Sequence, residues 1–351
     1  MSNATMLIRT FGIGFLAALA LACAGQPTSA KVCLRGLNIS GAEYGDVNGV
    51  HGTNYTYPSV STVRYFADKG MNVVRLPFLW DRLQPALGGN LDQRELTRLN
   101  DAVSMIRNHG MAIVLDPHNF GYYGSKRLMT SDLTAGHFAD FWIRVALEFA
   151  DQNDVIFGLM NEPYDIPAED WLLAANQAVA GIRAVGADNL ILVPGSYWSG
   201  ASSWENPAEG GANGIIMAGL VDPADNFAYE VHQYLDEDFS GTHDTCPQAD
   251  RAVDALKSFT QWLERNDARG FLGEFGGSAD PACLDGLEQM IETMDQFSER
   301  WVGWTYWAAG DWWPASEANN IQPSGPEDRP QLTAVMRAGS ASAPAQCATQ
   351  N

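Results

Sequence analysis

The sequence is poor in basic residues. Only 21 of its 351 residues are Lys or Arg, against 42 Asp or Glu, and the formal net charge is −21. A chain this acidic repels phosphate backbones and anionic lipid headgroups. We therefore expect no nucleic acid partner, no membrane partner for the mature protein, and an uncharged substrate.

Two further absences narrow the class of protein. The sequence has no Cys-x-x-Cys pair, which argues against a zinc cluster, and no glycine-rich phosphate turn near its start, which argues against a doubly wound nucleotide-binding sheet. The acidic stretch 236–244 lacks the ligand spacing of a calcium loop, so we interpret it as a solvated loop. We predict no metal and no cofactor.

Long hydrophobic runs are also scarce. Residues 1–30 resemble an export signal, because Arg9 precedes the apolar stretch 11–24 and small residues follow it. The apolar stretch is too short for a comfortable membrane span. We predict a signal peptide over 1–30 and a secreted protein, extracellular or periplasmic. The alternative is a lipoprotein modified at Cys23, which the residues before that cysteine fit poorly.

Four cysteines remain beyond the predicted signal. An even number of cysteines in an exported chain indicates disulfides. Spacing alone leaves all three pairings open for the four residues, which are Cys33, Cys246, Cys283 and Cys347.

Short apolar runs alternate with amphipathic stretches through most of the chain. Helical periodicity is clearest over 96–106, where Gly110 follows as a C-cap glycine, and it recurs over 138–149, 171–182, 252–263 and 284–297. Eight strand–helix units predict a (β/α)₈ TIM barrel, with a single catalytic domain over 31–337 and a short tail over 338–351. The eight predicted strands are 32–38, 72–77, 111–117, 155–160, 189–194, 227–232, 271–275 and 301–307.

Polar or aromatic residues stand at the end of nearly every predicted strand. The carboxyl ends of the strands carry the active site in barrels of this kind, so these side chains should converge. The residues in question are Asn38, Arg75, His118, Asn161, Glu162, Trp198, His232, Glu274 and Trp307.

Two of these residues, Glu162 and Glu274, are a pair of glutamates held at strand ends. Such a pair suits the hydrolysis of glycosidic bonds, with Glu162 as general acid/base and Glu274 as nucleophile. The flanking glycines Gly273 and Gly276 allow a sharp turn. The alternative for each glutamate taken alone is a solvated turn residue.

Other residues are predicted to support the pair. Arg75 would lower the pKa of Glu274, and Tyr234 would donate a hydrogen bond to it. Glu230 is a rival carboxylate on the sixth strand, and we expect it one layer deeper as a buried hydrogen-bonding group. His118 and His232 would orient substrate hydroxyls or the carboxylates, although a single histidine at a strand end is more often structural.

Aromatic residues are the remaining candidates for binding. Trp307 is a candidate stacking platform at the point of cleavage. Five more tryptophans fall in or near loops that follow the second, fifth and eighth strands, and would extend a groove for a linear glycan. They are Trp80, Trp198, Trp204, Trp312 and Trp313. The alternative for each of them is core packing.

These residues resemble the motifs of glycoside hydrolase family 5, the cellulase family of retaining barrel glycosidases, from residue 31 to about 337. The segment 232–246 is the most specific, and with 87–92 it resembles the subfamily of fungal and related bacterial endo-β-1,4-glucanases. The matching motifs, in order, are VRLP at 74–77, DPHN at 116–119, MNEP at 160–163, HQY at 232–234 and GEFG at 273–276.

The resemblance implies a retaining endo-β-1,4-glucanase acting on cellulose or related β-glucans. It implies Glu162 as acid/base and Glu274 as nucleophile. It also implies a Cys246–Cys283 disulfide, which leaves Cys33 and Cys347 for each other. The remaining residues that match active-site positions or accompany those motifs are Arg75, His118, Asn119, Asn161, Trp198, His232, Tyr234 and Trp307.

Several alternatives remain open on the same scaffold. One is a transglycosylase that remodels glucan, and another is a mannanase or xylanase, because loop shape decides the substrate. A non-catalytic glucan-binding protein is the alternative from a different class. The chain shows no linker or cellulose-binding module after the eighth unit, so soluble or amorphous glucan is the expected substrate and a monomer the expected state.

Overall fold

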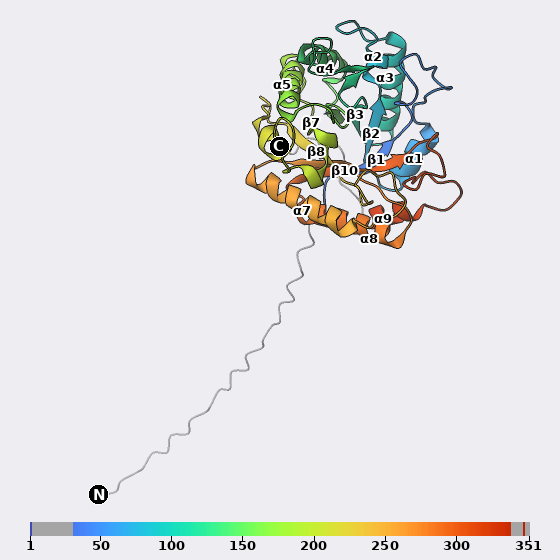
Figure 1. Ribbon diagram of the computed structural model, residues 1–351. Helices are drawn as coiled ribbons and strands as arrows, with labels where there is room; N and C mark the ends of the chain where they lie inside the picture. The colour runs from blue at the N-terminus through green and yellow to red at the C-terminus, as the bar shows by residue number, and fades with distance from the viewer. Residues whose placement is uncertain (2–30, 338–346, 348–351) are drawn as a thin grey trace.

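The computed structural model describes residue 1, residues 31–337 and residue 347 (Figure 1). The predicted export signal, the lipidation alternative at Cys23 and most of the predicted tail lie outside the described residues. Those assignments remain predictions. Among the residues that the structure describes, no helix has the length and apolar character to cross a membrane.

Eight parallel strands close into a barrel, and helices surround them (Figure 1). The strands follow one another around the barrel in the order β1-β10-β9-β8-β7-β6-β3-β2. The prediction of a (β/α)₈ barrel is therefore confirmed. The strand bounds are β1 Leu34–Ile39, β2 Val73–Phe78, β3 Ala112–Pro117, β6 Val155–Gly158, β7 Ile191–Pro194, β8 Phe227–His232, β9 Gly270–Glu274 and β10 Trp301–Ala309.

The five predicted helices are present, each within a few residues of its expected bounds. Asp92 accepts hydrogen bonds from the first backbone amides of α3, and Gly110 follows that helix with a φ of 74°, as a C-cap glycine should. The five helices are α3 Gln93–Asn108, α4 Ala135–Phe149, α5 Ala168–Ala184, α7 Ala249–Arg265 and α8 Pro281–Gln296.

The remaining elements are short, and the sequence did not predict them. Helix α1 buries only Thr62, Val63 and Phe66, so its apolar stripe is too narrow to stand out from the surrounding polar residues. The others lie within loops, where local hydrogen bonds decide their conformation. The full set is α1 Val60–Asp68, α2 Trp80–Leu83, β4 Tyr122–Tyr123, β5 Lys126–Arg127, η1 Tyr197–Ser199, η2 Ala201–Ser203, α6 Asn213–Ile216, η3 Met217–Gly219 and α9 Pro330–Met336.

Two disulfides join distant parts of the chain. Cys246 is bonded to Cys283, which links the loop before α7 to the first turn of α8, and Cys33 is bonded to Cys347. Both predicted pairings are confirmed. Cys347 is buried in the core cluster that contains Leu34, the first residue of β1, so the end of the chain packs against the start of the barrel.

We predict that a Cys33→Ser/Cys347→Ser double variant unfolds at a lower urea concentration than the native protein. The bridge closes a loop across 314 positions, and its loss should reduce the free energy of unfolding by about 4 kcal/mol, because the unfolded chain regains conformational entropy. The matched control is Cys246→Ser/Cys283→Ser, whose separation of 37 positions predicts a smaller loss. An unchanged midpoint in the first variant would contradict the prediction.

Candidate active site

The two predicted catalytic glutamates converge at the carboxyl end of the barrel. Glu274 is the last residue of β9, and Glu162 follows β6 in the loop before α5. The backbone of Glu162 has a φ of 39°, in the left-handed region that a non-glycine residue rarely adopts. Strained backbone of this kind is typical of functional sites, where the surrounding structure holds a side chain in one direction.

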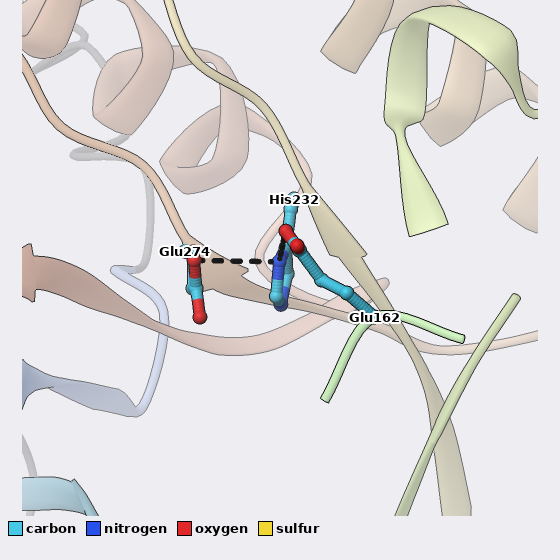
Figure 2. A group of neighbouring side chains, drawn as sticks. All are labelled: Glu162, His232 and Glu274. Atoms are coloured by element: carbon cyan, nitrogen blue, oxygen red, sulfur yellow. Dashed lines mark hydrogen bonds and ion pairs between the residues drawn. The ribbon is translucent and has the colours of Figure 1, made fainter. Parts of the chain in front are cut away.

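His232, the last residue of β8, lies between the two glutamates (Figure 2). Its Nδ1 atom is 2.6 Å from Oε1 of Glu162 and 3.6 Å from Oε2 of Glu274. One carboxylate oxygen of Glu162 and one of Glu274 lie within 4.8 Å of each other. Retaining glycosidases hold their two carboxyl groups about 5 Å apart, whereas inverting enzymes need roughly 6.5–9.5 Å to admit a water molecule. The spacing therefore fits retention.

Arg75 is the centre of the buried polar network below the pair. Its guanidinium is fully buried and lies 3.0 Å from Glu274, 2.9 Å from Asp116 and 2.9 Å from Glu230. Burial alone would lower the pKa of Arg75, but these carboxylates outweigh burial and raise it. The guanidinium therefore remains charged. Two amide oxygens also accept hydrogen bonds from it, those of Asn38 and Asn161.

Glu274 receives the two contacts predicted for it. Arg75 lies against Oε1, and the hydroxyl of Tyr234 donates to Oε2 at 2.8 Å. The charge of Arg75 lowers the pKa of Glu274, as predicted, but the net shift is upward. Burial and the charge of Glu162 raise the pKa of Glu274, and the opposing charges of His232 and Arg75 only reduce this effect. His232 and Arg75 therefore reduce the free-energy cost of ionising Glu274 but do not remove that cost.

The groups around His232 favour its protonated form. Burial by itself lowers the pKa of His232, but the charge of Glu274 and the hydrogen bonds to Glu162 and Glu230 raise it to about 10. A protonated imidazole donates hydrogen bonds and cannot ligate a metal. Glu162, His232 and Glu274 form a compact group of possible metal ligands, and a metal would have to displace the proton of His232 to bind there.

Glu230 lies one layer deeper, as predicted. It is buried, pairs with Nε of Arg75 at 2.9 Å, and lies 3.4 Å from Nε2 of His232. Asn161 also helps to hold Arg75 in place, because its amide oxygen accepts a hydrogen bond from the guanidinium at 2.9 Å. The amide nitrogen of Asn161 is buried and has no hydrogen-bond partner within the described part of the chain. That nitrogen is therefore a donor available to a ligand.

Asp116 is a functional residue that the sequence reasoning missed. It is buried on β3 and accepts a hydrogen bond from Nδ1 of His118 at 2.8 Å. Burial lowers the pKa of His118, but the charge and hydrogen bond of Asp116, together with the charges of Glu274 and Glu43, outweigh burial and raise it. The His118 ring also stacks on Trp307, with centroids 5.3 Å apart and planes 16° apart. The two-residue spacing of Asp116 and His118 along one strand was the available signal.

The structure places two other predicted site residues at the edge of the site. The side-chain amide of Asn119 bonds to α2 through both its oxygen and its nitrogen. The oxygen accepts a hydrogen bond from the backbone amide of Trp80 at 2.7 Å, and the nitrogen lies 3.4 Å from the carboxylate of Asp81. Asn119 therefore supports a loop. Trp198 is 52% exposed and stacks on Tyr164, with centroids 5.1 Å apart and planes 13° apart, so it is available as a platform.

The groove prediction was wrong for two tryptophans. Trp80 is fully buried and Trp204 is 1% exposed, and both pack within the core. Trp312 is 38% exposed, and Trp313 lies edge-on to Trp307. Strand position does not tell whether an indole in a following loop turns outward or inward, and only the outward ones can meet a ligand.

A cleft of about 510 Å³ opens beside Glu162 and His232. Trp198 and Tyr197 form part of its wall, from a loop in which residues 197–199 all have positive φ. Residues 238–240 of the acidic stretch also line this cleft. Asp236, the first residue of the acidic stretch, is buried and accepts hydrogen bonds from the backbone amides of residues 241–243. It therefore holds the loop together, and the prediction of a solvated loop was wrong for this residue.

Known proteins resemble this chain along most of its length. The family model "Cellulase (glycosyl hydrolase family 5)" matches residues 27–310. Endo-β-1,4-glucanase B of Aspergillus niger is 38% identical over 282 residues, which span 79% of this chain and 82% of the relative. Endo-β-1,4-glucanase B of Emericella nidulans is 35% identical over 312 residues, which span 88% of this chain and 92% of the relative.

Solved structures agree with the fold and the family. XacCel5A, in complex with cellopentaose, superposes with a TM-score of 0.85 at 44% identity over 88% of this chain and 99% of that chain. An endo-β-1,4-glucanase from Xanthomonas axonopodis pv. citri also gives 0.85, at 42% identity over 88% of this chain and 98% of that chain. Together with the paired glutamates at the strand ends, these matches establish that the chain belongs to the cellulases of glycosyl hydrolase family 5 and is a glycoside hydrolase.

Proposed function

We propose that this glycoside hydrolase is a retaining endo-β-1,4-glucanase that cleaves internal bonds of cellulose or related β-glucans. The observation that carries the proposal is the approach of Glu162 and Glu274 within 4.8 Å across the carboxyl end of a family 5 barrel. Only the retaining arrangement of two carboxyl groups has so short a separation.

The reaction follows from the positions of the two carboxyls. Ionised Glu274 attacks the anomeric carbon while Glu162 gives its proton to the leaving oxygen, and a covalent glycosyl–enzyme forms. Glu162 then takes a proton from water, which attacks the same carbon and releases the sugar with net retention. Arg75 and Tyr234 hold the two oxygens of Glu274, so the nucleophile has one orientation before the substrate arrives.

The surrounding side chains suit an uncharged sugar. Trp307, backed by His118, offers an indole face at the point of cleavage, and Trp198 offers a second face along the cleft. The buried amide nitrogen of Asn161 is available for a sugar hydroxyl. XacCel5A was solved with cellopentaose, and the curated relatives are endo-β-1,4-glucanases, which supports a β-1,4-glucan as the substrate here.

We also infer that the protein acts outside the cytoplasm, as a monomer. The two disulfides support an oxidising compartment, because reducing cytosol does not maintain such bonds in most proteins. The site needs no second copy to be complete, since both glutamates and their supporting residues come from one barrel.

We predict that Glu274→Gln reduces the turnover of carboxymethylcellulose by at least about a thousandfold, because an amide cannot form the glycosyl–enzyme. The matched control is Glu237→Gln, an exposed position in the loop after β8, which should retain native rates. Circular dichroism should show the native fold in both. Substantial activity in Glu274→Gln would exclude Glu274 as the nucleophile.

Parallel assays of the two variants on mannan and xylan would test the choice of substrate.

We predict that the acidic limb of the kcat/KM profile lies above the ordinary carboxyl pKa of 4.5, because Glu274 reacts only when ionised and its pKa is raised. Replacing His118 with Asn should move this limb to higher pH, since the positive charge of His118 lowers the pKa of Glu274. The exposed His51→Asn variant is the control. A limb that stays in place, or moves to lower pH, in His118→Asn would contradict this assignment.

A further inference from the structure

The active-site cleft continues into a second hollow. This hollow has a volume of about 360 Å³ and lies between η2 and α7, with Ser258 and Asp254 of α7 on one side. It shares two lining residues with the active-site cleft, Ser202 and Phe239. A chain that leaves the active-site cleft past these two residues therefore enters the second hollow directly. We call it the α7 groove.

The α7 groove lies on the side of the leaving group. The cleft that leads to it is lined by Glu162 and Trp198, whereas Glu274 and Trp307 do not line it among the described residues. A general acid must reach the oxygen of the bond that breaks, and the leaving part of the substrate lies beyond that oxygen. The direction from Glu162 through Ser202 therefore runs toward the reducing end of a bound glucan.

The walls of the α7 groove are held in place before any ligand binds. The amide of Ser202 donates to Oε1 of the buried Gln233 at 2.9 Å, which ties η2 to the end of β8. Trp204, which follows η2, packs edge-on against Phe259 of α7 with centroids 5.0 Å apart. A preformed groove binds with little loss of conformational entropy.

The chemistry of the α7 groove suits a neutral polyhydroxylated ligand. Asn206 and Arg251 have N–H groups beyond those that bond Ser202 and Gln248, and they offer donors. The Ser258 hydroxyl already donates to the Asp254 carbonyl, so its oxygen offers an acceptor, as do the carboxylates of Asp254 and Glu205. The guanidinium of Arg251 also lies 5.4 Å from the centroid of Phe239, which fixes the boundary between the two hollows. Lys257 and Arg265 pair with Asp254 and Glu205 at 3.1 Å and 2.6 Å, so the carboxylates of the groove are neutralised by neighbouring cations.

We propose that the α7 groove is a distal subsite for the leaving-group end of longer β-1,4-glucan chains. Sugar units beyond those that contact Trp198 pass over Ser202 and Phe239, and their hydroxyls bind the polar side chains between η2 and α7. The inference rests on the proposed function and deepens it, because it makes cleavage depend on the number of glucosyl units after the scissile bond.

The test is Ser258→Trp, which fills the groove from an exposed position on α7. We expect kcat/KM on cellohexaose to fall by about fivefold to tenfold, because one or two hydrogen bonds to sugar hydroxyls are lost, while cellotetraose is cleaved at the native rate. With cellohexaose labelled at its reducing end, the native enzyme should release longer labelled fragments than the variant, because the label leaves with the part that occupies the groove.

Gln261→Trp is the matched control, because it adds the same ring to an exposed position one turn further along α7, outside the groove. It should match the native protein on both substrates. Equal rates and equal labelled products for Ser258→Trp and Gln261→Trp would overturn the proposal. If Ser258→Trp also slows the cleavage of cellotetraose, the milder variant Asn206→Ala provides the test. Unchanged labelled products from cellohexaose in Asn206→Ala would then overturn the proposal. Failure of the native protein to cleave either oligosaccharide would instead refute the proposed function.

Discussion

The neutralisation of one buried cation is the constraint on which the site depends. Arg75 is fully buried, and a guanidinium out of water is stable only when carboxylates and hydrogen-bond acceptors surround it. Its contacts come from five other strands or strand ends around the barrel: Asn38 of β1, Asp116 of β3, Asn161 after β6, Glu230 of β8 and Glu274 of β9. The barrel must close for these groups to meet, so forming the fold and positioning the nucleophile are the same event.

The same network separates the roles of the two glutamates. Glu274 is gripped on both oxygens, by Arg75 and Tyr234, while Glu162 extends from a strained loop residue toward His232 and the cleft. Burial lowers the pKa of His232, but the carboxylates of Glu274, Glu162 and Glu230 outweigh burial and raise this pKa to about 10. Arg75 on β2 and His232 on β8 thus lower the free-energy cost of ionising the buried Glu274. The ionised form is the one that attacks the substrate.

Much of the fold, and the identity of the two catalytic glutamates, could be predicted from the sequence. The periodicity of apolar residues and the residues at strand ends are local signals that a linear sequence displays. The eight strands and the deeper position of Glu230 agreed with expectation. Both disulfide pairings agreed too, but they followed from the family resemblance, since spacing alone left three pairings open. Features that depend on side-chain direction did not. Trp80 and Trp204 turned into the core, and Asn119 turned toward α2. The supporting role of Asp116 and the net pKa direction of Glu274 depend on burial by neighbouring strands, which a linear sequence does not display.

The most direct measurement is to trap the covalent intermediate. A 2-deoxy-2-fluoro-β-cellobioside with a good leaving group slows the release of the glycosyl–enzyme, because the fluorine destabilises the oxocarbenium-like transition state. Proteolysis and mass spectrometry then locate the sugar. The account predicts one 2-deoxy-2-fluorocellobiosyl group per chain, on the peptide that contains Glu274, and no trapping when Arg75 is replaced by Met in a folded variant. A label on Glu162 or Glu230, or efficient trapping without Arg75, would contradict the claim that this buried cation presents Glu274 as the nucleophile.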